Sequence, residues 1–348
     1  MRGDVRSGAP RTLFAIDTHT AGAPTRIVTG GLPQLRGATV AERMAYFQAS
    51  LDHLRSLLVL EPRGHNAMYV AVPTAPNSPN AAAGIFFANS GGYLPICIHG
   101  LIGFTWAGLE IGFLPRGTAA GATVHTVDLP GDSVLVTANY LGGRLDSITV
   151  RAPESFVHTP SVCVRAGDEP ALECSIGFCG VFVALVDVDQ LARRDGAGQP
   201  FISRARAPHL VSLGAQLLRT LNQQLSVSHP RRTQSERVKL VLFYERVNAR
   251  LIRDLVTDDQ GRLDRSPCGA GVAALLALLY ARGQHTSEAE LCVMTCLDTQ
   301  LHGRVVSAAQ YATHSATATE IRGAASITGF HQFVLDPDDP LPEGLSLP

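Results

Sequence analysis

The sequence predicts an α+β fold made of two similar halves. Runs with strand-like alternation outnumber helical runs, and they do not alternate regularly with helices as they would in a βαβ array. The 348 residues are natural for two domains. One short pattern, Cys-x-x-Gly at the start of an apolar run, occurs at Cys97 and again at Cys268, about half the chain apart.

The first half is predicted to begin with a short strand, a polar loop at 17–22 and a second strand. An amphipathic helix at 40–58 follows, with Phe47 and Leu54 on its apolar face. A turn precedes two further strands. The predicted strands of this part are 13–16, 26–29, 67–72 and 83–88.

The stretch 93–114 is long enough to consider as a membrane span. It contains His99, Glu110 and several glycines, so a buried helix is the better interpretation. Beyond it, a further amphipathic helix is predicted at 210–225 and an apolar helix at 272–280. The strands predicted in this part are 123–129, 133–140, 145–151, 176–186, 237–244, 251–256, 303–308 and 324–335.

The segment around Cys268 has the features of a helix start. Ser266 is a candidate N-cap and Pro267 suits the first helical position, which would place Cys268 in the first turn. Free backbone N–H groups and the helix dipole lower a thiol pKa there. The neighbouring glycines leave those N–H groups open to an anion, so the pattern predicts a reactive thiol beside an anion-binding site.

Composition and spacing exclude several classes of protein. The formal net charge is −1 and no basic stripe is present, which argues against nucleic acid as a partner. Lys239 is the only lysine, and its alternating apolar surroundings make a pyridoxal phosphate enzyme improbable. The Gly269-x-Gly271 segment follows a polar turn rather than a strand, so it is a poor dinucleotide fingerprint. No Cys-x-x-Cys pair or zinc spacing occurs, and no metal or cofactor is expected.

Cysteine usage predicts a reducing, cytoplasmic location. Seven cysteines are an odd number in a long chain, and the apolar piece near its start is too short for a signal-peptide core. Two of the seven belong to the repeated pattern. The other five are predicted to be small buried hydrophobic residues: Cys163, Cys174, Cys179, Cys292 and Cys296.

Two thiols on opposite sides of a cleft suit the inversion of a carbon stereocentre. One thiolate removes a proton from one face while a thiol delivers a proton to the other, and the roles reverse in the opposite direction. Helix N-terminal N–H groups would hold a carboxylate and stabilise the charge that grows as Cα loses its proton. A dehydratase and a non-catalytic thiol-containing binding protein are the alternatives.

Several blocks of the chain resemble the proline racemase family, which includes proline racemases, 4-hydroxyproline 2-epimerases and trans-3-hydroxyproline dehydratases. The resemblance covers nearly the whole chain, and the Asp-Arg-Ser-Pro-Cys-Gly block at 264–269 is its most specific part. Supporting blocks are Asp17-Thr18-His19-Thr20, Arg26-Ile27-Val28, Glu61-Pro62-Arg63-Gly64-His65, Gly91-Gly92-Tyr93-Leu94, Cys97-x-His99-Gly100 and Ile327-Thr328-Gly329.

The resemblance implies a cofactor-independent isomerase with the diaminopimelate-epimerase-like fold, two pseudo-symmetric α/β halves each with a curved sheet around a central helix. The first half would comprise 12–145 plus a returning strand at 325–340, and the second 146–324. A small imino acid, proline or a hydroxyproline, is the implied substrate. No membrane is implied, and a homodimer is the family's habit.

Residue roles also follow from the resemblance. Cys97 and Cys268 match the acid/base pair, and His99 and Asp264 match residues that meet the substrate ring nitrogen. Backbone N–H groups of Ile98, Gly100, Gly269 and Ala270 would hold the carboxylate. The dehydratase branch typically has threonine at the second cysteine position, so Cys268 favours racemisation or epimerisation. The chain departs from the family pattern at Ala23, Ile98, Leu101 and Ala270, which leaves proline, 4-hydroxyproline and 3-hydroxyproline open as substrates.

Overall fold

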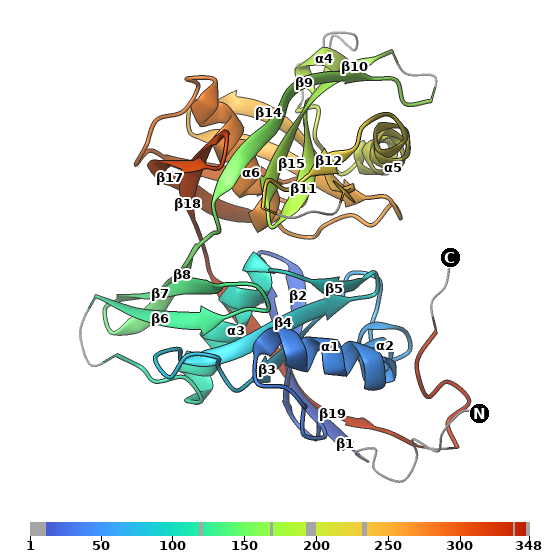
Figure 1. The fold of residues 1–348 in the computed structure, drawn as a ribbon, viewed down its shortest axis with the longest axis vertical. Helices are drawn as coiled ribbons and strands as arrows, with labels where there is room; N and C mark the ends of the chain where they lie inside the picture. Colours follow the sequence, from blue (N-terminus) through green and yellow to red (C-terminus); the bar gives the residue numbers. More distant parts are fainter. Residues whose placement is uncertain are drawn as a thin grey trace. The chain divides into compact units, whose positions relative to one another are not determined.

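The computed structural model describes residues 12–117, 121–167, 170–192, 200–231, 235–336 and 338–345. The chain forms two compact units, one from residues 1–148 and 324–348 and the other from residues 149–323 (Figure 1). Each unit is a sheet of many strands with few helices, as an α+β fold requires. Within the described residues, no helix combines the length and apolar character needed to cross a membrane.

The first unit contains most of the N-terminal elements and the last strand. Its elements are β1 (Thr12–Thr20), β2 (Ala23–Gly30), α1 (Val40–Ser50), α2 (Asp52–Val59), β3 (Tyr69–Thr74), β4 (Ala83–Asn89), β5 (Gly92–Leu94), α3 (Ile98–Ile111), β6 (Ala122–Asp128), β7 (Ser133–Leu141), β8 (Arg144–Arg151) and β19 (Ala325–Val334). Strand β8 runs across the boundary between the units at Ile148.

The second unit contains the rest. Its elements are β9 (Ser155–Val164), β10 (Leu172–Cys179), β11 (Val181–Asp187), α4 (Asp189–Ala192), α5 (Ala207–Gln224), β12 (Val227–Ser228), β13 (Ser235–Glu236), β14 (Val238–Asn248), β15 (Leu251–Asp258), α6 (Gly269–Ala281), β16 (Glu290–Thr295), β17 (Gln300–Tyr311) and β18 (His314–Gly323).

The two units repeat one topology. In the first, β1 pairs with β2, β2 runs parallel to β3, β3 pairs with β4, and β4 runs parallel to β6 around the intervening α3. In the second, β10, β11, β14, β15 and β16 make the same sequence of antiparallel and parallel pairings around α6. A further strand pairs with the first strand of each series: β19, which returns to the first unit from the C-terminal end of the chain, pairs with β1, and β9 pairs with β10.

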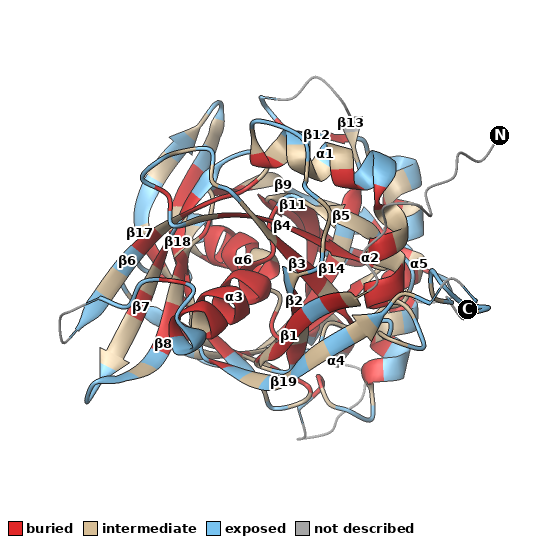
Figure 2. Cartoon of the chain, turned by 90° about the horizontal axis from the view of Figure 1, so that it is seen from below, coloured by how far each residue is buried: buried red, intermediate tan, exposed pale blue. Residues whose placement is uncertain are grey.

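A buried helix forms the centre of each unit. Helices α3 and α6 are apolar almost all round, which is typical of a helix enclosed by other elements rather than lying on a surface. Figure 2 shows both helices buried along most of their length. Helix α3 packs against β1, β2 and β19, and α6 packs against β9, β10 and β18. Gly103 lets α3 lie close to β1, because a Cβ there would stand 2.5 Å from the Thr18 hydroxyl oxygen.

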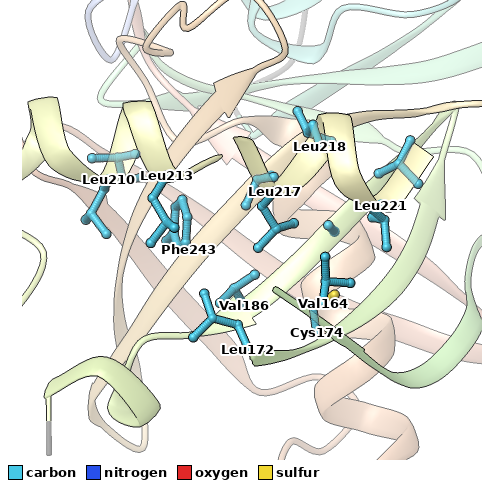
Figure 3. Close-up of a cluster of buried hydrophobic side chains, with 14 of the residues drawn as sticks. Val164, Leu172, Cys174, Val186, Leu210, Leu213, Leu217, Leu218, Leu221 and Phe243 are labelled. Atoms are coloured by element: carbon cyan, nitrogen blue, oxygen red, sulfur yellow. The ribbon is translucent and has the colours of Figure 1, made fainter. Parts of the chain in front are cut away.

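Amphipathic helices cover the outer faces of the sheets. Helix α5 directs Leu210, Leu213, Leu217 and Leu221 toward Phe243 of β14 and the neighbouring strands (Figure 3). The leucines recur every three or four residues, so they lie on one side of the helix. Burial of such a side chain stabilises the fold by roughly 1.5–3 kcal/mol. The second unit therefore has one core on each side of its sheet.

The prediction of a polar loop at 17–22 is wrong for its first four residues. Strand β1 continues through Thr20, and only Ala21 and Gly22 form the turn into β2. Asp17 lies in mid-strand because its charge is paired: Arg26, its partner in the β1–β2 ladder, donates two hydrogen bonds of 2.9 and 2.8 Å to its carboxylate. Tertiary pairing thus keeps a polar segment in a buried strand.

Two other predicted segments are divided in the structure. The helix expected at 40–58 breaks at Leu51, whose ψ of 15° is not helical, and α2 begins anew at Asp52. Asp52 then binds the Arg55 guanidinium at 2.7 Å and accepts a hydrogen bond from the Tyr93 hydroxyl. The run 176–186 is two antiparallel strands joined at Gly180, whose φ of +71° favours glycine.

Candidate active site

Cys97 occupies the N-cap of α3. Its backbone is extended, with φ −141° and ψ 102°, and its carbonyl accepts the first helical hydrogen bond from Leu101 N–H at 2.9 Å. The Cys97 side chain makes no capping hydrogen bond to the N–H groups of the first turn, which comprises Ile98, His99 and Gly100. Cys97 is buried, so its thiol lies in a sheltered setting at the positive end of the helix dipole.

His99 lies against the Cys97 thiol. The Cys97 Sγ is 3.6 Å from His99 Nδ1 and 3.5 Å from Nε2, and the tautomer decides which atom donates. Burial lowers the pKa of His99 to about 4, so its ring is neutral at neutral pH. The ring meets that of Tyr69 edge-on at a centroid distance of 4.5 Å, and the Thr20 hydroxyl donates to the His99 carbonyl at 2.9 Å. The thiol therefore has a fixed, uncharged imidazole beside it.

Cys268 is the N-cap of α6, and the predicted helix start at Ser266 and Pro267 is wrong. The helix begins at Gly269, and the Cys268 carbonyl accepts from Val272 N–H at 2.7 Å. Ser266 is buried, and its hydroxyl donates to the Pro267 carbonyl instead of a helix N–H. The two cysteines therefore have the same position relative to their helices, at the cap rather than in the first turn, and neither cysteine side chain makes a capping hydrogen bond.

Asp264 stands beside Cys268 within the second unit. The Cys268 thiol and the backbone N–H groups of Arg265 and Ser266 are hydrogen-bonded to its carboxylate. Burial nevertheless raises the pKa of Asp264 to about 6, above the range of an ordinary aspartate. The Asp264 N–H donates to the Val256 carbonyl of β15 at 2.9 Å, which ties this turn to the sheet. The carboxylate is therefore held near the thiol by backbone geometry.

A glycine three residues after each cysteine makes room for neighbouring side chains, and at Gly100 one of these is the thiol itself. A Cβ on Gly100 would stand 2.6 Å from the Phe87 ring and 2.9 Å from the Cys97 Sγ. On Gly271 a Cβ would stand 2.7 Å from Leu242 and 3.8 Å from the Cys268 Sγ. Residues i and i+3 are neighbours on a helix, which explains the spacing of the Cys-x-x-Gly pattern. The glycine is thus required for space as well as for access to the backbone.

Gly100→Ala is expected to lower the rate of a reaction that uses the Cys97 thiol about 100-fold, while the protein stays folded. The added methyl group pushes against the Cys97 thiol, and a shift of about 1 Å at a reacting group has an effect of this size. Steady-state rates and circular dichroism measure the two quantities. Gly131→Ala is the matched control, because nothing lies within 4 Å of a Cβ at that position. Equal activity of the two variants would show that Gly100 has no role at the thiol.

The remaining predicted site residues lie with these two groups. Ile98 and Gly269 are buried in the first turns of α3 and α6, and Ala270 is half-buried next to Gly269. The first unit thus brings together Cys97, Ile98, His99 and Gly100, and the second brings together Asp264, Cys268, Gly269 and Ala270. Tyr69, which contacts His99, was missed because nothing around it in the sequence predicts its nearness to α3.

The other cysteines confirm the prediction only in part. Cys174, Cys179 and Cys296 are buried, and burial raises the pKa of the first two to about 12 and about 11. Cys163 is exposed and Cys292 is half-buried, so the prediction is wrong for the first and incomplete for the second. Cys163 lies opposite Glu173 in the β9–β10 ladder, where its side chain points to solvent.

Within the described ranges, no group of three or more His, Cys, Asp and Glu side chains is placed to hold a metal ion. Lys239, the only lysine of the chain, lies exposed on β14. The two thiols, the neutral imidazole and the Asp264 carboxylate are therefore the reactive groups that the described residues place at the two helix starts.

Comparison with known proteins shows the family to which the chain belongs. The family model described as "Proline racemase" matches residues 15–346. The chain belongs to the proline racemase family. A proline racemase from Clostridioides difficile is 34% identical over 340 residues, which cover 97% of this chain and 98% of the relative. A trans-3-hydroxy-L-proline dehydratase from Bacillus cereus is 32% identical, covering 95% of this chain and 97% of the relative.

A solved structure of a proline racemase family relative supports the fold directly. The hydroxyproline epimerase from Agrobacterium vitis, with bound trans-4-hydroxy-L-proline, superposes with a TM-score of 0.86 at 29% sequence identity. The alignment covers 97% of this chain and 96% of that one. The predicted fold of two α/β halves, each with a curved sheet around a central helix, is therefore confirmed for this chain.

Proposed function

We propose that this chain interconverts the Cα stereoisomers of proline or 4-hydroxyproline, without a cofactor, and that Cys97 and Cys268 are its two acid/base groups. The observation that most supports this proposal is the matched position of the two thiols. Each is the N-cap of an apolar helix and makes no side-chain capping hydrogen bond, in two units of the same topology. Racemase and epimerase relatives that match this chain over nearly its whole length support the same reaction.

The proposed mechanism needs one thiolate and one thiol. The thiolate takes the α-proton from one face of the substrate, and the thiol on the other face gives its proton to Cα. One C–H bond breaks and one forms, so the thiol and thiolate have exchanged roles when the product leaves. The N–H groups of Ile98, Gly100, Gly269 and Ala270 would bind the substrate carboxylate and stabilise the negative charge that builds up on it.

Asp264 and His99 are proposed to recognise the ring nitrogen of the substrate. An ionised Asp264 carboxylate forms a charge-assisted hydrogen bond with a secondary ammonium, and that charge makes the α-proton more acidic. His99, kept neutral by burial, would accept or donate a hydrogen bond without repelling the ammonium. In this proposal Asp264 supplies the negative charge that binds the ring nitrogen, and His99 orients the ring nitrogen.

Incubation with L-proline and with trans-4-hydroxy-L-proline, followed by NMR and polarimetry, tests the proposed function. Formation of the other Cα stereoisomer is expected for at least one of them, with no loss of water. A ketimine-forming product from trans-3-hydroxy-L-proline instead would make the chain a dehydratase, the activity of its Bacillus cereus relative. Binding without any turnover would make it a thiol-containing binding protein.

Asp264→Asn is expected to weaken binding of proline by roughly 1.5–3 kcal/mol, the range for a hydrogen bond to a charged group. Pyrrole-2-carboxylate has no ammonium and should lose little affinity. The pKa of about 6 sets the pH dependence in the wild-type protein: the carboxylate is ionised above this pH, so proline affinity falls as pH drops through about 6. Isothermal titration calorimetry measures both ligands.

The exposed Asp259, in the turn that follows β15, provides the control for Asp264. Asp259→Asn should leave both affinities unchanged. If Asp264→Asn weakened proline and pyrrole-2-carboxylate equally, Asp264 would be a structural residue of its turn, and the proposed recognition of the ammonium would be wrong.

The setting of the enzyme is also a proposal. No disulfide joins any of the seven cysteines, all of which lie in the described ranges, and this favours a reducing compartment, the cytoplasm. The exposed position of Lys239 on β14 is unsuited to a Schiff base with pyridoxal phosphate, which supports cofactor-independent chemistry. The proposal of a homodimer rests on the resemblance to the family alone.

A further inference from the structure

A buried carboxyl group, that of Asp254, lies on β15 close to the Asp264 turn. Asp254 of β15 has no exposed surface, and neither of its carboxyl oxygens has a hydrogen-bond partner among the described residues. Buried polar groups are nearly always hydrogen-bonded, and an ionised carboxylate in such a place is very unfavourable. An unsatisfied buried carboxyl group lowers the stability of the folded protein. Its position next to a candidate site therefore suggests a role in function.

The strand geometry places Asp254 on the side of the sheet away from α5. Leu255, the next residue, faces the α5 core together with its ladder partner Phe243. Successive side chains of a strand point to opposite faces, so Asp254 points the other way. Two residues further along β15, the Val256 carbonyl accepts the N–H of Asp264. The turn that carries Asp264 is therefore anchored beside β15, two residues along the strand from Asp254.

Among the described residues, the charged group that acts directly on Asp254 is the carboxylate of Asp264, while Arg282 and Arg246 act on the neighbouring Tyr244 and Arg204 acts on Cys296. Asp264 acts on it from the turn before α6, Tyr244 lies opposite it on β14, and Cys296 follows its β16 partner Thr295. Burial is the main cause that raises the pKa of Asp254 well above the ordinary range, and the negative charge of Asp264 raises it further. Two neighbouring carboxyls in a low dielectric resist double ionisation, so Asp254 holds the proton while Asp264 is charged.

We propose that Asp254 is a positioning residue for Asp264: a proton-bearing acid close to the site that ionises when a cationic nitrogen binds against Asp264. The proposal rests on the proposed function. A bound ammonium offsets the Asp264 charge and places a positive charge near Asp254, and both changes favour ionisation of the buried acid against the cost of its burial. The proton passes to solvent, and the two carboxylates together then face the substrate cation. A ligand without an ammonium leaves the proton in place.

The first arm of the test needs no ligand. An acid whose pKa is raised on folding destabilises the folded state increasingly as pH rises above its unfolded value near 4. Asp254→Asn removes that penalty, so its melting temperature should exceed that of the wild type by an amount that grows from pH 5 to pH 8. The exposed Asp259→Asn should show no such trend. A melting temperature lowered equally at every pH would mean that Asp254 is ionised and paired, and would overturn the proposal.

The second arm measures proton release. Calorimetry at pH 8 in buffers of different ionisation enthalpy should show protons released when proline binds to the wild-type protein, and less release with Asp254→Asn. Pyrrole-2-carboxylate should show no difference between the two. On the wild type alone, infrared difference spectra should show loss of a protonated-carboxyl C=O stretch when proline is added. Equal release by both proteins, with no infrared change, would contradict the proposal.

The two arms also separate this inference from the proposed function. If the chain inverts proline but releases the same number of protons with Asp254→Asn, the inference fails and the function stands. If proline is not bound or inverted at all, the proposed function fails, and the claim that Asp254 responds to a bound cationic nitrogen fails with it. The melting experiment then still shows whether a neutral acid lies near Asp264.

Discussion

Cys97→Ser and Cys268→Ser are each expected to lower the rate of stereoisomer interconversion by roughly 10²–10⁴-fold, the range for loss of a general acid or base. Serine preserves the size of the side chain. Its hydroxyl is a far weaker acid than a thiol, so it neither exists as an anion near neutral pH nor delivers a proton readily. Because both thiols act in each direction of the reaction, the forward and reverse rates should fall together. Polarimetry with each stereoisomer as the starting material measures this.

Cys163→Ser is the matched control for these two substitutions. Cys163 is an exposed cysteine on β9 of the second unit, and the same chemical change there should leave the rate unchanged. Residual exchange of the α-proton in one direction is compatible with the account, since the remaining thiol still reaches one face. Full interconversion by either single serine variant would rule out the two-base mechanism.

Arg26→Met is expected to destabilise the first unit by about 3–5 kcal/mol, the cost of removing one partner from a buried ion pair. Arg26 donates twice to Asp17 and also donates to the carbonyls of Leu58 and Arg63, both at 2.6 Å. Its guanidinium also lies 4.3 Å from the centre of the Phe333 ring. The substitution leaves a buried Asp17 carboxylate and two carbonyls without this donor. Chemical denaturation measures the loss.

The exposed pair Arg116–Glu110 gives the comparison for this loss. Its two side chains retain 51% and 40% of their surface, and exposed pairs contribute about 0–1 kcal/mol. Arg116→Met should therefore hardly change the denaturation midpoint. A similar small change for Arg26→Met would mean that the buried pair contributes little to holding β1, β2 and the end of α2 together.

The central helices could be predicted from the sequence because their signal is local. Runs such as 101–109 and 272–280 are apolar throughout, and length, polar flanks and glycines separate a buried helix from a membrane span. The strand at 17–20 could not be predicted, since Asp17 is polar and its partner Arg26 is known only once β1 and β2 pair. Strands β9, β16 and β18 were missed for a similar reason, because ladder partners far along the chain define them.

The candidate site also has features that could be predicted from the sequence and others that could not. The repeated Cys-x-x-Gly pattern located both thiols because a helix start and its neighbouring glycine are close in sequence. The helix start at Cys268 was placed too early, since Ser266 and Pro267 have the composition of a cap but the Ser266 hydroxyl bonds elsewhere. Tyr69 and Asp254 reach the site through tertiary packing, from strands whose sequences contain no sign of it.

The most direct test of two-base catalysis is a deuterium label followed early in the reaction. L-proline, or trans-4-hydroxy-L-proline if that is the better substrate, is incubated with the enzyme in deuterium oxide. NMR then measures Cα deuterium separately in product and in recovered substrate. The group that delivers the new proton differs from the one that removed the old one, and it has exchanged with solvent. The product should therefore carry deuterium while the recovered substrate keeps protium. Deuterium entering the recovered substrate as fast as the product, or protium carried into the product, would contradict the account.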